Sequence, residues 1–119
     1  MSAEKGLEVA SIPVPDRRKS PRYRYAEAIR IRKGDGSEQA ALSIEISEGG
    51  MSVATDESLK IGEEVELDSV VDATVAAVVR HKQGRIYGFE FLELRLEHQE
   101  RIRKMCRSLP RFVPKHLNI

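Results

Sequence analysis

The sequence has no tryptophan, one cysteine (Cys106) and only 5% aromatic residues. One cysteine excludes an internal disulfide, and few aromatic side chains leave few stacking platforms for single-stranded nucleic acid. Its 20 Lys and Arg residues balance 19 Asp and Glu, so the net charge of +1 gives no chain-wide attraction for nucleic acid or anionic membranes. No apolar run approaches the roughly 20 residues that span a bilayer, and charged residues rather than an apolar segment follow Met1. We therefore expect a soluble cytoplasmic protein that neither enters membranes nor binds nucleic acid.

A chain of 119 residues is long enough for one modest hydrophobic core. Residues 1–15 show no sustained period and end in two prolines, which disfavour a helix or a central strand. We interpret them as a flexible N-terminal tail and residues 110–119 as a C-terminal tail. The expected domain lies between them, over residues 16–109.

Positive charge is concentrated in residues 16–24, DRRKSPRYR, which hold five basic residues and one acid. Pro21 biases Ser20 away from helical angles and supplies no amide hydrogen. This segment therefore reads as an arginine loop rather than a basic helix. A solvated basic linker is the ordinary interpretation of such a run, and local sequence alone does not distinguish it from an anion site.

Apolar residues alternate with polar ones from residue 25 to residue 94, which is typical of half-buried strands. Glycine-containing turns separate several of the runs that show this pattern. The six runs are residues 26–33, 41–47, 51–56, 63–68, 72–81 and 84–94. In the second run the alternation is expected to send Leu42, Ile44 and Ile46 inward. The same alternation turns Ser43, Glu45 and Ser47 outward.

Helical spacing replaces the alternation after Leu94. Basic residues stand on the other positions of this segment, which Pro110 ends. The residues that recur every three or four positions are Leu96, Gln99, Ile102, Met105, Cys106 and Leu109. The predicted fold is all-β with a C-terminal helix, a six-stranded antiparallel β-barrel over residues 25–94 capped by one α-helix over residues 95–109.

Two short motifs stand out on this pattern. Arg18 and Arg22 form an RxxxR segment. The second motif, EISEGG, begins at Glu45 and places Ser47 and Gly50 at the end of a predicted strand. The combination resembles the PilZ domain, a bacterial receptor module for cyclic di-GMP marked by RxxxR and [D/N]xSxxG. The resemblance covers roughly residues 16–109, and it departs from the family pattern where Glu45 replaces Asp or Asn.

The resemblance implies a split-barrel fold and a cyclic di-GMP site without cofactor or metal. The implied site residues are Arg17, Arg18, Arg22, Glu45, Ser47, Gly49, Gly50 and Gly88. Guanidinium forks suit phosphates and guanine edges, and a carboxylate accepts from guanine N1–H and the exocyclic amine. Arg17, directly before the motif, suggests a stacked pair of ligand molecules. Ligand binding would order the arginine loop and change the contacts with an unidentified protein partner.

A second interpretation is a degenerate PilZ adaptor in which Glu45 marks the loss of cyclic di-GMP binding. An enzyme is not expected. The three histidines, His81, His98 and His116, are scattered along the sequence, and no cysteine–histidine metal spacing occurs. Ser47 lies in no nucleophile motif.

Overall fold

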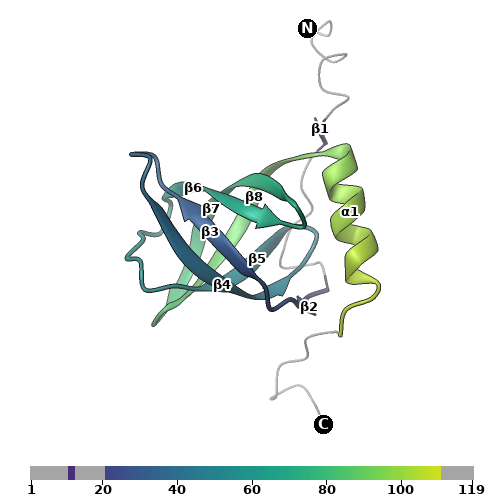
Figure 1. The fold of residues 1–119 in the computed structure, drawn as a ribbon, viewed down its shortest axis with the longest axis horizontal. Coiled ribbons are helices and arrows are strands. Elements are labelled where there is room, and N and C mark those ends of the chain that lie inside the picture. The colour runs from purple at the N-terminus through teal and green to yellow at the C-terminus, as the bar shows by residue number, and fades with distance from the viewer. Residues whose placement is uncertain (1–10, 13–20, 111–119) are drawn as a thin grey trace, which may run out of the picture.

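The computed structural model describes residues 11–12 and 21–110. Six strands of this part close into an antiparallel barrel in the order β8-β5-β4-β3-β6-β7, and β7 pairs back to β8 (Figure 1). The strands are β3 (Ala28–Arg32), β4 (Glu38–Ile46), β5 (Gly50–Ala54), β6 (Glu64–Val70), β7 (Ala73–Gln83) and β8 (Ile86–Arg95). The predicted barrel and C-terminal helix are confirmed.

Two short strands join the barrel from outside the ring. β1 (Ser11–Ile12) pairs with Leu94 and Arg95 of β8, and β2 (Tyr23–Arg24) pairs with Glu45 and Ile46 of β4. The expected N-terminal tail thus contains one strand pairing and the expected arginine loop another. Residues 1–10, 13–20 and 111–119 lie outside the described residues.

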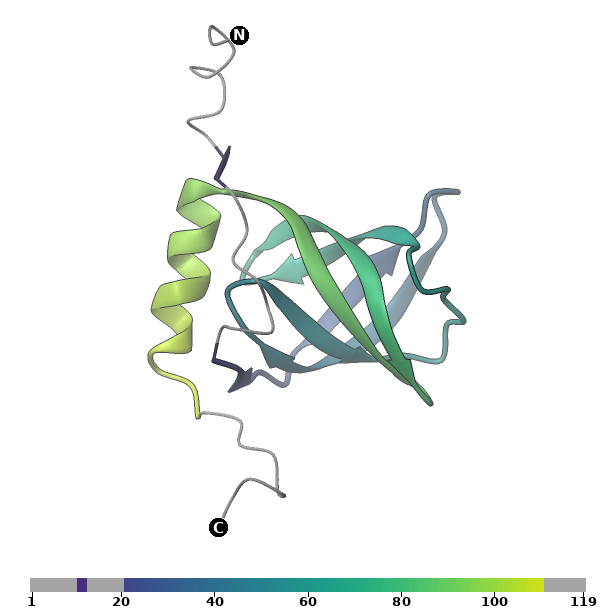
Figure 2. The same cartoon turned by 180° about the vertical axis from the view of Figure 1, so that it is seen from behind.

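The helix α1 (Leu96–Cys106) lies along one end of the barrel, as both views show (Figures 1 and 2). Its buried face consists of His98, Gln99, Ile102 and Cys106. The prediction that Leu96 belongs to this face is wrong, since Leu96 is 43% exposed. Leu96 precedes Ile102 by six residues, which is about 120° around the helix, whereas His98 precedes it by one turn.

Large apolar side chains fill the barrel interior, and Phe89, Phe91, Ile31 and Ile46 are at most 1% exposed. They come from alternate positions of neighbouring strands, as the period of two requires. Each such side chain contributes about 1.5–3 kcal/mol when it is removed from water.

A β-bulge in β4 overturns part of the predicted alternation. Ser43 pairs with Val53 and Glu45 with Ser52, so Ile44 is an extra residue on β4. Leu42, expected inside, is 52% exposed, while Ser43, expected outside, is 1% exposed. The Ser43 hydroxyl donates to the carbonyl of Tyr25 and accepts from the amide of Glu27 at 2.9 Å.

The turn between β6 and β7 has unusual backbone angles. Val70 pairs with Ala73, and the two residues between them, Val71 and Asp72, have φ of +50° and +63°. A β-branched residue at positive φ costs roughly 1–3 kcal/mol and persists only where its surroundings hold it. Here the Val71 amide donates to the Tyr25 hydroxyl at 3.2 Å, and His98 Nε2 donates to the Val70 carbonyl at 2.9 Å.

Candidate ligand site

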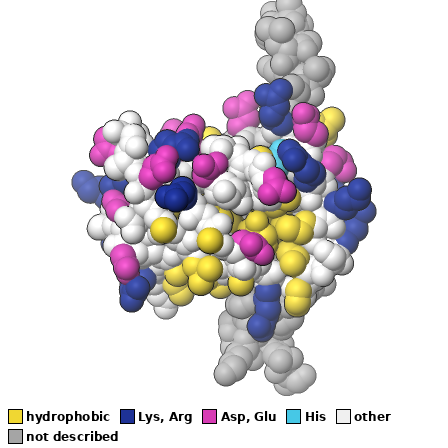
Figure 3. All heavy atoms as spheres, viewed as in Figure 1, with side chains coloured by type: hydrophobic (Ala, Val, Ile, Leu, Met, Phe, Trp, Pro, Cys, Tyr) yellow, Lys and Arg dark blue, Asp and Glu magenta, His cyan; other side chains and the backbone are white. Residues whose placement is uncertain are grey.

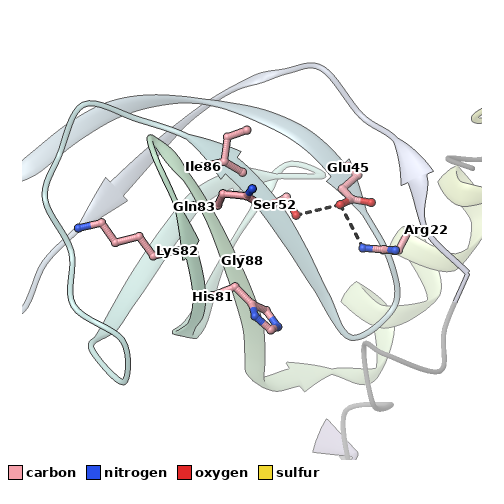
Figure 4. A pocket seen from close by; sticks show the side chains of 8 residues that line it. All are labelled: Arg22, Glu45, Ser52, His81, Lys82, Gln83, Ile86 and Gly88. Carbon is pink, nitrogen blue, oxygen red and sulfur yellow. Dashed lines mark hydrogen bonds and ion pairs between the residues drawn. The ribbon is translucent and has the colours of Figure 1, made fainter. Parts of the chain in front are cut away.

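A cavity of about 610 Å³ opens on the barrel beside β2, within the size range of roughly 300–1,000 Å³ typical of small-molecule sites. Strands β4, β5, β7 and β8 form its walls, and Arg22 reaches it from just before β2 (Figure 4). Its lining is mostly polar: Arg22, Glu45, Ser52, His81, Lys82, Gln83, Ile86 and Gly88.

Glu45 is the most deeply placed charged group of this cavity, and its side chain is 9% exposed. Its Oε2 accepts from the Ser52 hydroxyl at 3.0 Å and from Arg22 Nη1 at 3.4 Å. Its Oε1 is buried and has no hydrogen-bond partner, a condition shared within the described residues only by Gln99 Oε1. An unpaired buried carboxylate oxygen is costly, so a turn of the Glu45 side chain that brings this oxygen to a donor in the cavity is favoured.

Arg22 lies opposite Glu45 because β2 follows it directly and pairs with β4. The Arg24 amide also donates to the Pro110 carbonyl at 2.8 Å, so this strand is held between the barrel and the chain after α1. The Arg22 side chain is 39% exposed and faces the cavity. Its guanidinium therefore meets both the solvent and the Glu45 carboxylate.

Gly88 and His81 are paired across β7 and β8 in the far wall. A Cβ atom at Gly88 would lie 3.2 Å from both Cβ and Cδ2 of His81, so the absence of a side chain lets the imidazole pack over the strand. Lys82 Nζ lies 5.5 Å from the centre of the Tyr87 ring, within cation–π range. This wall thus carries an imidazole over the strand, whereas the Lys82 ammonium group extends away from Glu45 and Arg22 (Figure 4).

Ser47 and Gly49 lie in the turn between β4 and β5, Gly50 begins β5, and none of the three lines the cavity. The Ser47 hydroxyl accepts from the Gly49 amide at 3.2 Å and donates to the Gly50 carbonyl at 3.3 Å. The Gly49 carbonyl accepts from the Phe91 amide at 2.9 Å. Ser47 is 1% exposed, so the expectation that its hydroxyl points outward is wrong.

The structure therefore brings together three of the predicted site residues, Arg22, Glu45 and Gly88. Arg17 and Arg18 lie outside the described residues. Sequence reasoning missed the other lining residues, Ser52, His81, Lys82, Gln83 and Ile86. Ser52 becomes the neighbour of Glu45 only through the bulge in β4, and the remaining four belong to an exposed hairpin whose residues carry no pattern typical of a site.

The described part of the chain shows no cluster of metal-binding residues and no helix that could span a membrane. No three His, Cys, Asp or Glu residues gather closely enough there to hold a metal ion. None of its helices has the length and apolar character needed to cross a membrane.

Comparison with known proteins agrees with this architecture. A family model for the PilZ domain matches residues 16–108. No curated protein matches the chain. The PilZ domain of YcgR from Escherichia coli, solved with c-di-GMP, is 16% identical, with a TM-score of 0.61 over 79% of this chain and 92% of that one.

Two further solved structures share the fold. The Bacillus subtilis inhibitor of motility MotI/DgrA is 23% identical, with a TM-score of 0.65 over 78% of this chain and 51% of that one. The PilZ domain of CeSA from a cellulose-synthesizing bacterium is 16% identical, with a TM-score of 0.58 over 73% of this chain and 95% of that one. Because the family model spans most of the sequence and the barrel, helix and motif positions agree with it, the chain belongs to the PilZ domain family.

Proposed function

We propose that this chain is a receptor for cyclic di-GMP and not an enzyme. The observation that carries the proposal is the buried, unpaired Oε1 of Glu45 in a cavity that the second arginine of the RxxxR motif also lines. Membership of the PilZ family and the c-di-GMP in the YcgR structure support the choice of ligand.

Each side of the cavity suits one part of this ligand. The Glu45 carboxylate, once turned toward the cavity, would accept from guanine N1–H and the exocyclic amine. Arg22 would donate in two-point geometry to a phosphate or to guanine N7 and O6. Arg18, from the same motif, would bind alongside Arg22. Ser47, Gly49 and Gly50 would act through the shape of the β4–β5 turn, which fixes the position of Glu45.

Ligand binding would also change what the chain offers to a protein partner. Arg22 contacts Glu45 without ligand, and a phosphate would draw this guanidinium toward itself. Residues 16–24 would then be held against the barrel face that carries Glu45. The signal would pass to a partner protein through this rearranged surface.

Calorimetric titration with cyclic di-GMP, with GTP as competitor, tests the proposal. We expect saturable binding that Arg22→Ala weakens at least about tenfold, equivalent to 1.4 kcal/mol. Unchanged affinity in this variant would contradict the placement of the ligand. The stoichiometry tests the stacked pair: two ligands per chain, reduced to one by Arg17→Ala, would support it, and one ligand in the natural chain would contradict it.

The Arg22–Glu45 ion pair also supports the second function, an adaptor that binds no nucleotide. A glutamate reaches farther than the Asp or Asn of the family pattern, and here it engages the arginine that a ligand would need. Glu45→Asp distinguishes the two functions. A gain in affinity from near zero would favour the adaptor, whereas a small change would show that glutamate serves the receptor.

A further inference from the structure

Ion pairs engage most cations on the described barrel surface. Six of them lie 2.5 to 3.9 Å from a carboxylate oxygen: Arg22, Arg30, Arg32, Lys33, Arg80 and Arg85. The barrel surface is therefore largely neutralised by its own carboxylates.

The outer face of α1 is different. Arg101, Lys104 and Arg107, which we call the basic face, are exposed, and none has an ion pair in the part of the chain that the structure describes. They surround a hollow of about 160 Å³ together with Glu100, which is engaged by Arg103 at 2.8 Å. Figure 3 shows blue side chains along this outer edge of the helix. Across the described residues, no other helix or strand presents more than one unpaired cation.

The helix is fixed with this face outward. Ile102 and Cys106 pack into the core, and Arg103 binds Glu48 of the β4–β5 turn with two nitrogen–oxygen distances of 3.2 Å. Favourable interaction with the helix dipole accounts for basic residues in the last turn, but Arg101 lies in the middle of the helix. The helix dipole therefore does not account for the position of Arg101.

We propose that the basic face of α1 binds an acidic helix of a partner protein. Arg101, Lys104 and the C-cap residue Arg107 follow one another at a rise of about 4.5 Å per step, and a second helix with acidic residues three positions apart has the same rise. Glu100 adds an acceptor inside the cluster, which suits a partner helix that carries a basic residue among its acids.

A protein partner fits this face better than a membrane surface does. Helices that lie on membranes combine basic residues with an exposed apolar face. On α1 the one large exposed hydrophobic residue is Leu96, at the far end from Lys104 and Arg107, and Glu97 is exposed as well. The separate carboxylates of a partner helix can lie opposite the cations alone. A uniformly anionic membrane surface would also lie against Glu97 and Glu100 and repel them.

The test uses the full chain without cyclic di-GMP, so its outcome does not depend on the proposed receptor function. The probe is a fluorescent, capped, alanine-rich peptide of about 16 residues with Glu at every third or fourth position. The control peptide has Gln in place of Glu. Anisotropy is measured at low salt and again with added salt, which should weaken binding between exposed charges.

Two triple variants make the comparison. Arg101→Gln/Lys104→Gln/Arg107→Gln should weaken peptide binding at least about tenfold, while Arg30→Gln/Arg80→Gln/Arg85→Gln removes the same charge from the barrel and should change it less than about threefold. Thermal unfolding checks that both variants fold, and amide chemical shifts should move along α1.

Equal losses in both triple variants, or chemical shifts that move only on the barrel, would overturn the proposal. Absence of binding by the folded natural chain would do the same. Binding to vesicles of phosphatidylserine and phosphatidylcholine that depends on the basic face, without binding to the acidic peptide, would replace the partner helix with a membrane.

Discussion

The cavity beside β2 and the turn between β6 and β7 deviate from an ordinary barrel in opposite ways. Around the cavity no non-glycine residue has a positive φ, although β4 bulges beside Glu45, and the buried carboxylate of Glu45 has an unpaired oxygen. At the turn Val71 and Asp72 have strained angles, yet the flanking backbone groups are paired with Tyr25 and His98. An unmet hydrogen bond on a residue that lines a cavity points to a ligand, whereas strain held by hydrogen bonds points to a structural role.

Tyr25 makes this contrast instructive because it lies three residues after Arg22, yet its hydroxyl serves the turn rather than the cavity. Burial raises the pKa of this hydroxyl, and the hydrogen bond from Val71 partly offsets the increase. The neutral phenol therefore supports the turn at physiological pH. Substitutions in the two regions should separate stability from ligand binding.

The largest effect on stability is expected from Tyr25→Phe. It leaves the Val71 amide without an acceptor next to a strained residue, which should lower the free energy of unfolding by about 2 kcal/mol. Urea unfolding measures this, with Tyr23→Phe as the control, since Tyr23 makes no hydrogen bond through its hydroxyl in the described structure. Equal losses in both variants would show that the turn does not depend on Tyr25.

Glu45→Gln should have the opposite profile. We expect cyclic di-GMP affinity to fall at least about tenfold, because the amide group lacks the charge and presents one acceptor oxygen. The free energy of unfolding should change by less than about 1 kcal/mol, since the Arg22 partner is partly exposed. Titration and urea unfolding on the same samples test the pair of expectations. A large loss of stability with unchanged affinity would reverse the roles of the two regions.

Gly88→Ala probes the far wall of the cavity. The added Cβ would approach His81 to 3.2 Å, so the imidazole must shift, and we expect cyclic di-GMP affinity to fall about threefold. Gly34→Ala is a matched control, because nothing lies within 4 Å of a Cβ at Gly34. Titration of both variants measures the effect. If Gly34→Ala weakened binding as much, the close contact with His81 would not be the cause.

The smallest effect is expected from Asp72→Gly. Glycine adopts positive φ without strain and Asp72 is exposed, so the free energy of unfolding should rise by about 0.5 kcal/mol. Thr74→Gly, an exposed strand position in the same hairpin, should lower it instead. Thermal unfolding of the two variants gives the comparison, and destabilisation by Asp72→Gly would mean that the turn is not strained in solution.

Sequence patterns predicted the strands and the helix because side-chain periodicity reports directly on which face is buried. They also brought Arg22, Glu45 and Gly88 into one hypothesis through the family motifs. They did not predict the outward position of Leu42, because a bulge shifts the alternation by one residue without a local signature. The hidden Ser47 hydroxyl was missed for a related reason, since a turn can use a hydroxyl that a strand would expose.

The sequence by itself determined the six barrel strands, the helix, their order and the family, since these depend on local preference, period and motif spacing. Only the tertiary structure decided which polar atoms remain without partners and which cations remain without carboxylates. Those outcomes depend on distances between strands far apart in the chain, such as β4 to β5 and β2 to β4. For that reason the unpaired oxygen of Glu45 and the basic face of α1 emerged only once the barrel was closed and the helix was placed on it.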